Sequence, residues 1–228
     1  MNFLTIIARY QEDLSWVEKL DTDVIIYNKG ESYPYDYPKI DLENIGREAE
    51  TFLRAIIEFY DKLNEYDGLI FLQGNPFEHC EDVLEKINNI KKCDEIIYLT
   101  NQIKFNVINA NHKIHNKSSY IISYMFGESA KNFDKNQDTG WFKVALLCEC
   151  LGISLEGIVK YDWAYGAQYM VPSKFILKKP ITWWEDTLKT LFLYLNVLST
   201  KEEATIIFEF SWPLIYDPKY KLLNMITE

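Results

Sequence analysis

GREAETFLRAIIEFYDKLNEYDGLIFL, residues 46–72, combines the two periodicities that decide the fold of this 228-residue chain. Apolar side chains recur every three or four residues from Ala49 to Leu63, which is the spacing of one buried face of an α-helix. The apolar run that ends at Leu72 has the length and composition of a buried β-strand. The segment therefore predicts a helix from Gly46 and a strand over Asp67–Leu72.

The rest of the chain continues this alternation of strands and helices. Further strands are predicted at Phe3–Ala8, Asp23–Tyr27, Glu95–Leu99 and Gly166–Val171. Further helices are predicted to end near Leu20 and Asn89, to span Thr139–Leu151 and Thr182–Leu198, and to run from Thr200 toward Pro213. Thr200 and Glu203 have the spacing of a capping box. The pattern predicts an α/β fold with a mostly parallel sheet flanked by helices.

Two stretches are predicted to lack regular structure: the tyrosine-rich loop Glu31–Asn44 and the polar segment Thr100–Gln137. Long loops of this kind are often functional, so both are candidates for a mobile lid. No internal repeat or Gly/Ser linker interrupts the chain, and we therefore treat residues 1–228 as a single domain.

Composition narrows the classes of function. The 24 basic and 34 acidic residues give a net charge of −10, the wrong sign for a surface that tracks nucleic acid. The most apolar window, Leu188–Leu198, is too short to cross a bilayer, so no transmembrane segment is expected. The 4 cysteines have no CxxC spacing, and no signal peptide precedes the first strand. These features favour a protein of the reducing cytoplasm.

Several short strings, in order along almost the whole chain, resemble the DUF3431 family. They are IARYQEDLSW (7–16), IYNK (26–29), NIGREA (44–49), FLQGNPF (71–77), GAQY (166–169) and WP (212–213). That family in turn resembles the GT-A nucleotide-sugar glycosyltransferases. The resemblance implies a single GT-A-like, Rossmann-like domain that binds a nucleoside-diphosphate sugar, with a UDP-sugar favoured, and transfers the sugar to the hydroxyl of a glycan acceptor. It places the donor at the carboxyl edge of the sheet, where open α/β sheets generally bind ligands.

The resemblance assigns the donor nucleotide to residues that follow the strands or open a helix. They are Ala8, Arg9, Tyr10, Glu12, Asn28, Lys29, Gly46, Arg47, Gln73, Gly74 and Asn75. Tyr10 can stack on a base, and Lys29 can act as a point charge for a phosphate. Gly46 permits close approach of the backbone, and Arg47 adds positive charge to the free N–H groups of a helix start.

Each of these assignments has a purely structural alternative. Arg9 can pair with a neighbouring carboxylate, and Lys29 can lie in a solvated turn. Arg47 can form a surface pair with Glu48, whose position in the first helical turn also suits the helix dipole.

The segment Gln73–Asn75 lies where GT-A enzymes usually carry the Asp-x-Asp that holds Mg²⁺ or Mn²⁺. Neither end of this segment is acidic, and an amide ligand brings no charge to a hard cation. Asn75 and Glu78 are therefore weak metal candidates, with His79 close enough in sequence to assist. A metal-independent enzyme that neutralises the leaving diphosphate with Arg47 and Lys29 is an equal alternative. No cofactor is certain; Mn²⁺ or Mg²⁺ remains open.

Three carboxylates are candidates for the catalytic base that removes the acceptor proton: Asp162, Asp186 and Glu209. Their spacing does not rank them, and the Glu185–Asp186 pair also suits a helix N-terminus. The missing Asp-x-Asp leaves a second hypothesis, a non-catalytic GT-A-like module that binds a nucleotide or a glycan. His112 and His115 have helix-compatible spacing, but without a third histidine nearby they favour a solvated loop over a metal site.

Overall fold

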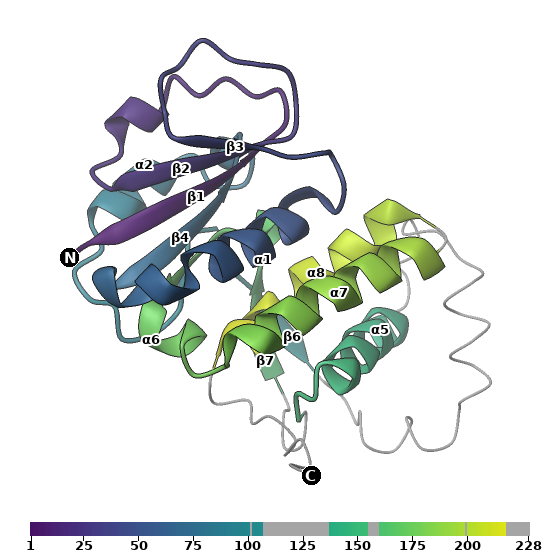
Figure 1. Ribbon diagram of the computed structural model, residues 1–228. Coiled ribbons are helices and arrows are strands. Elements are labelled where there is room, and N and C mark those ends of the chain that lie inside the picture. Colours follow the sequence, from purple (N-terminus) through teal and green to yellow (C-terminus); the bar gives the residue numbers. More distant parts are fainter. Residues whose placement is uncertain (101, 107–136, 155–159, 199, 218–228) are drawn as a thin grey trace.

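The computed structural model describes residues 1–100, 102–106, 137–154, 160–198 and 200–217, and these form an α/β fold (Figure 1). The main sheet has six strands in the order β3-β2-β1-β4-β8-β5. Along the chain they are β1 (Phe3–Arg9), β2 (Asp23–Asn28), β3 (Lys39–Asp41), β4 (Gly68–Gln73), β5 (Ile97–Tyr98) and β8 (Tyr169–Pro172). The strands predicted near the N-terminus and at Asp67–Leu72 are confirmed.

The prediction of a mostly parallel sheet is wrong, because the sheet is mixed. β1 pairs in parallel with β2 and β4, and β2 pairs in parallel with β3. β8 pairs antiparallel with both β4 and β5. The alternation of strands and helices constrains strands that follow one another, whereas β8 comes from a much later part of the chain and enters between β4 and β5 from the opposite end.

The helices cover both faces of this sheet. They are α1 (Arg47–Phe59), α2 (Val83–Asn88), α5 (Gln137–Cys150), α6 (Ser173–Ile176), α7 (Ile181–Val197) and α8 (Lys201–Tyr216). α1, α7 and α8 lie together on one face, with α5 against α8, and α2 lies behind the sheet (Figure 1). The predicted helices that correspond to α1, α5, α7 and α8 are confirmed. The helix predicted to end near Leu20 is only a 3₁₀ turn at Val17–Lys19.

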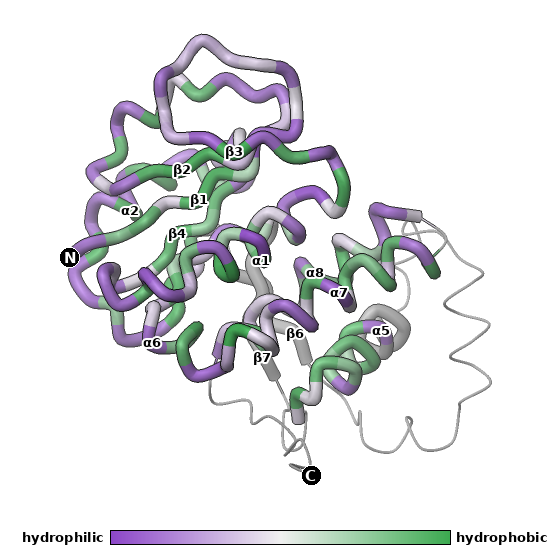
Figure 2. The backbone as a smooth tube through the Cα atoms, in the orientation of Figure 1, coloured by the Kyte–Doolittle hydropathy of each residue, from purple (hydrophilic) through white to green (hydrophobic). Residues whose placement is uncertain are grey.

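Alternate side chains of the strands enter two different cores. In β1, Leu4 and Ile6 belong to the core shared with α1, α7 and α8, while Phe3 and Ile7 belong to the core on the other face. This double burial explains why the central strands are nearly continuous apolar runs, as Figure 2 shows for β1, β2 and β4.

The N-terminus of α8 has the cap that the sequence predicted. The Thr200 hydroxyl oxygen accepts a hydrogen bond of 3.1 Å from the backbone N–H of Glu203. The Glu203 carboxylate forms a buried ion pair with Lys143 of α5. One residue therefore contributes to both the start of α8 and its packing against α5.

Four further strands differ from the prediction. The loop Glu31–Asn44 contains the edge strand β3, which pairs with β2. β6 (Gln102–Asn106) and β7 (Lys160–Ala164) form a separate antiparallel pair, and β7 packs against α8. The strand predicted over Gly166–Val171 begins only at Tyr169, after a 3₁₀ turn at Tyr165–Ala167. The rest of the segment predicted to be irregular, residues 107–136, lies outside the described residues.

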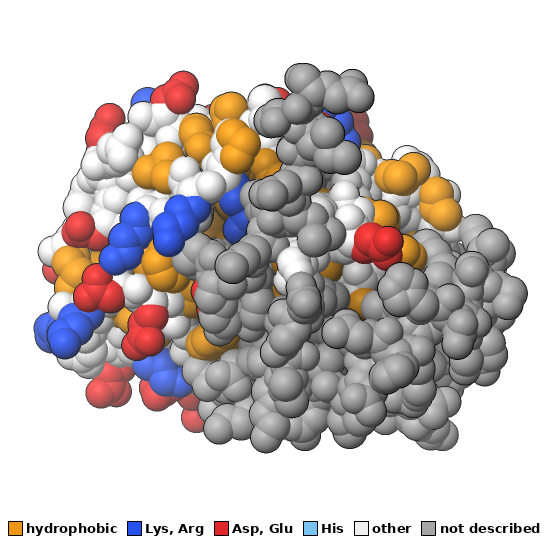
Figure 3. Space-filling model, turned by 90° about the horizontal axis from the view of Figure 1, so that it is seen from below, with side chains coloured by type: hydrophobic (Ala, Val, Ile, Leu, Met, Phe, Trp, Pro, Cys, Tyr) orange, Lys and Arg blue, Asp and Glu red, His pale blue; other side chains and the backbone are white. Residues whose placement is uncertain are grey.

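The surface carries charges of both signs. Figure 3 shows basic, acidic and apolar side chains among one another on the described part of one face. Within the residues that the structure describes, no helix combines the length and the apolar character needed to span a membrane.

Candidate functional site

A cavity of about 350 Å³ opens at the edge of the sheet where β1, β2 and β4 end. From β1 the chain proceeds to β2 and β3 on one side, and it then returns through α1 to β4 on the other side. β1 and β4 thus flank a switch point in the strand order, which is where open α/β sheets bind ligands. Arg9 ends β1, Gln73 ends β4, and both line the cavity.

The cavity brings together most of the residues that the sequence analysis assigned to a donor nucleotide. The predicted residues among its lining are Ala8, Arg9, Tyr10, Glu12, Lys29, Arg47, Gln73 and Asn75, together with the metal candidate Glu78. Asn44 and Glu48 also line it. Both belong to the string NIGREA, from which the sequence analysis assigned only Gly46 and Arg47 to a ligand. Asn28, Gly46 and Gly74 are not among the lining residues.

The Arg9 guanidinium is buried and binds the protein's own oxygen atoms. Over 2.6–3.2 Å it donates to the carbonyl oxygens of Tyr10, Glu12 and Glu31 and to the side-chain oxygen of Asn28. Its carbon lies 4.7 Å from the centre of the Tyr33 ring. Arg9 therefore ties the tyrosine-rich loop to the end of β1, and the alternative of a pair with a carboxylate is wrong because these acceptors are neutral.

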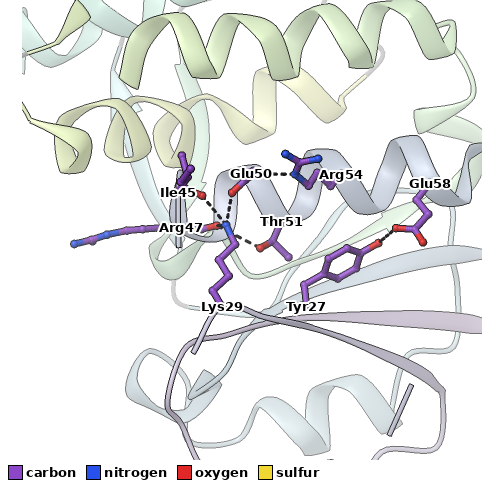
Figure 4. A network of polar contacts seen from close by, with 8 residues as sticks. All are labelled: Tyr27, Lys29, Ile45, Arg47, Glu50, Thr51, Arg54 and Glu58. Atoms are coloured by element: carbon purple, nitrogen blue, oxygen red, sulfur yellow. Dashed lines mark hydrogen bonds and ion pairs between the residues drawn. The ribbon is translucent and has the colours of Figure 1, made fainter. Parts of the chain in front are cut away.

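Lys29 is a structural cation rather than a free phosphate ligand. Its ammonium group donates to the carbonyl oxygens of Ile45 and Arg47, both at 2.7 Å, and to the Glu50 carboxylate at 2.6 Å (Figure 4). Three partners use the three N–H bonds of an ammonium group. The Lys29 and Glu50 side chains are each only 4% exposed, so the alternative of a solvated turn is also wrong.

The Lys29 contacts hold an unusual helix start. Gly46 and Arg47 both have positive φ, 67° and 47°, the left-handed region that few residues other than glycine adopt. A Cβ added at Gly46 would lie 2.8 Å from the Glu50 Cβ. Gly46 is thus required by the turn into α1. The turn and the packing against Glu50 explain this glycine without the predicted close approach to a ligand.

Asn28 and Gly74 also have structural roles. The buried Asn28 side chain donates to Gly30 and to Asp41 of β3, besides accepting from Arg9. A Cβ added at Gly74 would lie 2.4 Å from the Glu12 carboxylate. Gly74 therefore lets Glu12 pack against the end of β4, next to the cavity.

Arg47 is the one lining cation, among the described residues, whose side chain remains substantially exposed. Its guanidinium forms a 2.8 Å ion pair with Glu202 of α8, in which the two side chains are 54% and 61% exposed. In Figure 4 the Arg47 side chain points away from Lys29. The predicted alternative was a surface pair with Glu48. Arg47 does form a surface pair, but its partner is Glu202. An exposed ion pair is worth about 0–1 kcal/mol, so Arg47 can exchange Glu202 for an anionic ligand at little cost.

Glu209 of α8 is a half-buried carboxylate that is not itself a lining residue but interacts electrostatically with Glu48 and Arg47, which line the cavity. Its Oε1 accepts a 2.8 Å hydrogen bond from the backbone N–H of Gly166. Gly166, at φ 70°, packs so closely against Gln73 and His79 that an added Cβ would lie 2.5 Å from the His79 ring. Tertiary structure thus brings the GAQY string, the end of β4 and α8 to one place.

The electrostatic environment of Glu209 suits proton transfer near neutral pH. Burial raises the pKa of Glu209 to about 7, and the nearby Glu48 carboxylate adds to the rise, whereas the Gly166 hydrogen bond and the Arg47 charge oppose it. Burial also raises the pKa of Glu48. A carboxylate with a pKa close to the working pH has the property expected of a general base.

The family follows from comparison with known proteins. The model of the family described as protein of unknown function DUF3431 matches residues 4–224, nearly the whole chain. The chain belongs to the DUF3431 family. No curated protein and no solved structure matches it.

The structure also gives positions for the other two base candidates of this DUF3431 protein. Asp186 is on the solvent-exposed face of α7, where its carboxylate pairs with Lys189 at 2.7 Å, and it is not among the cavity residues. Asp162 lies within β7, opposite Lys104 of β6, rather than just before the strand that contains Tyr169. His112 and His115 lie outside the described residues. Of the two candidates whose side chains the structure describes, Glu209 is connected to the cavity through Gly166 and Gln73, whereas Asp186 pairs with Lys189 on the exposed face of α7.

The donor set at the cavity of the DUF3431 protein does not form a tight cation cage. Within the described part of the chain, no three His, Cys, Asp or Glu side chains gather in a metal-binding arrangement. Asn75 and Glu78 line the cavity and supply one amide and one carboxylate, which is fewer charged oxygen ligands than Mg²⁺ or Mn²⁺ normally takes from a protein. Of the two metal candidates, only Glu78 therefore offers a negative charge to a cation.

Substitution of Glu209 by glutamine in this DUF3431 protein is expected to stabilise the fold at pH 8 by about 1–3 kcal/mol and to have little effect at pH 4. The folded-state pKa of about 7 lies above the ordinary value of 4.5, so the native state favours the proton. Protonation of Glu209 therefore stabilises the native state fully below pH 4.5, and this stabilisation is lost as the pH rises through 7. Urea unfolding of both proteins at the two pH values tests this, and an equal difference at both would contradict it.

Proposed function

We propose that this protein is a glycosyltransferase that moves a sugar from a nucleoside-diphosphate sugar, with a UDP-sugar as the favoured donor, to a hydroxyl group of a carbohydrate acceptor. The observation that carries the proposal is the combination of Glu209, whose pKa is about 7, with a cavity at the β1/β4 switch point. The same cavity offers the exposed Tyr10 ring and the start of α1 with Arg47.

Glu209 and the residues that line the cavity have separate roles in the proposed reaction. The Glu209 carboxylate takes the proton of the acceptor hydroxyl, and the acceptor oxygen forms a bond to the anomeric carbon. The bond from that carbon to the diphosphate oxygen breaks, and its electron pair leaves with the diphosphate. Arg47 and the N–H groups at the start of α1 stabilise the departing negative charge. Tyr10 stacks on the base, a contact suited to an exposed aromatic ring.

The finer features of the family resemblance belong to the same proposal. A GT-A-like architecture is supported by the α/β sheet and by the site at its carboxyl edge. A cytoplasmic location is supported by the thiols of Cys80, Cys93, Cys148 and Cys150, all of which are free.

A ligand panel tests the proposal. Thermal shift is measured with UDP, GDP, CMP and UDP-sugars, each with and without Mn²⁺, because a ligand that binds only the native state raises the Tm. We expect a selective shift with uridine nucleotides, and release of UDP when a sugar acceptor is added to a UDP-sugar. Nucleotide binding without transfer to any acceptor would instead favour a non-catalytic nucleotide-binding module, and no shift with any ligand would reject both.

Arg47→Ala is expected to weaken UDP binding by about 1.5–3 kcal/mol, the contribution of a hydrogen bond to a charged group. The matched control is Glu202→Gln, which removes the partner of Arg47 without removing the guanidinium and should leave the affinity unchanged or slightly higher. Calorimetry measures both variants. Unchanged affinity in Arg47→Ala would mean that the diphosphate binds elsewhere.

A further inference from the structure

The charged side chains that line the cavity differ in how many of their polar groups already bind other atoms of the protein. Among the described lining residues the cations are Arg9, Lys29 and Arg47. Lys29 is buried and its three donors bind oxygen atoms of the protein, and the Nε and Nη1 donors of the buried Arg9 do the same. Among these three described cations, Arg47 is the one with an exposed side chain that can turn to a ligand, at the start of α1.

The acidic side chains differ in the same way. Glu12 lines the cavity, but its Oε2 accepts hydrogen bonds from the backbone N–H groups of Tyr10 and Gln11. Glu48 lies in the first turn of α1, where burial raises its pKa and so disfavours its charge. Glu78 is exposed, ends the 3₁₀ turn Pro76–Glu78, and forms no hydrogen bond or ion pair within the described residues. Among the described lining carboxylates, Glu78 is therefore the exposed one, and both of its oxygens are available.

We propose that Glu78 makes this site selective for donors with a neutral sugar and against donors whose sugar carries a carboxylate. This inference rests on the proposed glycosyltransferase function and names the substrate class of the same site. A free carboxylate can accept hydrogen bonds from two sugar hydroxyls and repels a second carboxylate. Tyr10 and Arg47, on other elements, contact the parts of the donor that all UDP-sugars share.

The proposed selectivity does not require one particular orientation of the sugar inside the cavity. Glu78 lines a cavity of about 350 Å³, so a sugar that enters this cavity comes within range of the Glu78 charge. Two like charges about 12 Å apart at an effective dielectric constant of about 20 repel each other enough to change an affinity by roughly tenfold. Both UDP-sugars carry the same diphosphate. Its repulsion by Glu78 therefore lowers both affinities equally and cancels from their ratio.

The experiment compares UDP, UDP-glucose and UDP-glucuronate by calorimetry at pH 8 and low salt. For the wild type we expect UDP-glucose to bind at least about tenfold more tightly than UDP-glucuronate. In Glu78→Gln, which keeps the size and removes the charge, this ratio should fall to about threefold or less. In Glu78→Lys it should reverse. The matched control Glu81→Gln removes an equally exposed charge from outside the cavity lining and should keep the wild-type ratio.

The possible failures are distinguishable. If UDP binds but the two UDP-sugars bind equally well to the wild type, or if Glu78→Gln keeps the wild-type ratio, the selectivity is overturned and the proposed function stands. A ratio that falls equally in Glu78→Gln and Glu81→Gln would mean that net charge, not Glu78, sets the selectivity, and also overturns the inference. If no uridine nucleotide binds, the selectivity and the proposed function fall together.

Discussion

Lys29→Met is expected to lower the free energy of unfolding by about 3 kcal/mol, near the lower end of what breaking a buried ion pair costs. The substitution leaves the Glu50 carboxylate buried with one partner fewer and leaves the carbonyl oxygens of Ile45 and Arg47 without their donor. Arg54 remains 2.7 Å from Glu50 and keeps the loss from being larger. Burial lowers the pKa of Lys29, and the hydrogen bond and charge of Glu50 oppose this effect. Urea denaturation measures the change.

Two further variants separate the buried pair from a general effect of charge. Lys39→Met removes a lysine whose pair with Asp41 is exposed, and it should change stability by less than about 1 kcal/mol. Lys29→Met combined with Glu50→Gln should recover part of the loss, because no uncompensated carboxylate then remains buried. A loss below about 1 kcal/mol in Lys29→Met alone would refute the structural role of Lys29. Because Lys29 holds the start of α1, a loss of nucleotide affinity is expected alongside.

Glu209→Gln is expected to reduce sugar transfer by about 10²–10⁴-fold, the range contributed by a general base, while nucleotide binding stays close to wild type. In the wild type, transfer should increase with pH and level off above an apparent pKa of about 7, because the base acts only after it has lost its proton. The glutamine retains an oxygen that can accept from Gly166, so the loss reports the proton transfer rather than the position of α8. Steady-state kinetics from pH 5 to 9 tests both points.

The other two acidic candidates provide the controls for this experiment. Asp186→Asn should leave transfer unchanged, since Asp186 pairs with Lys189 on the exposed face of α7. Asp162→Asn tests the base candidate on β7. Full activity in Glu209→Gln combined with loss in either other variant would move the base to that residue. Full activity in all three would remove every candidate.

Much of the fold could be predicted because it is encoded locally. The apolar face from Ala49 to Leu63 specifies α1 by its period, and the Thr200 hydroxyl caps α8 within three residues. Most of the cavity residues could be predicted as a group for a related reason. The carboxyl ends of neighbouring parallel strands meet at one edge of a sheet, so the ends of β1, β2 and β4 had to lie together.

Strand direction and edge pairing could not be predicted in the same way. β3 is short, and its partner β2 provides the hydrogen bonds that define it as a strand. β8 is a strand in either orientation, and only its position between β4 and β5 makes it antiparallel. In both cases the deciding hydrogen bonds join segments whose separation along the chain leaves no local signal.

The sequence by itself therefore determined the central strands and the main helices of this DUF3431 protein, and the edge of the sheet at which its polar strings gather. Tertiary structure alone decided what each charged residue does there. It gave Arg9 and Lys29 acceptors from the protein, and it left Arg47 exposed. It also placed Glu209 against Gly166, 43 residues away along the chain. The physical reason is that hydrogen bonding, burial and pKa depend on which groups surround a side chain in space, and a linear sequence does not specify these neighbours.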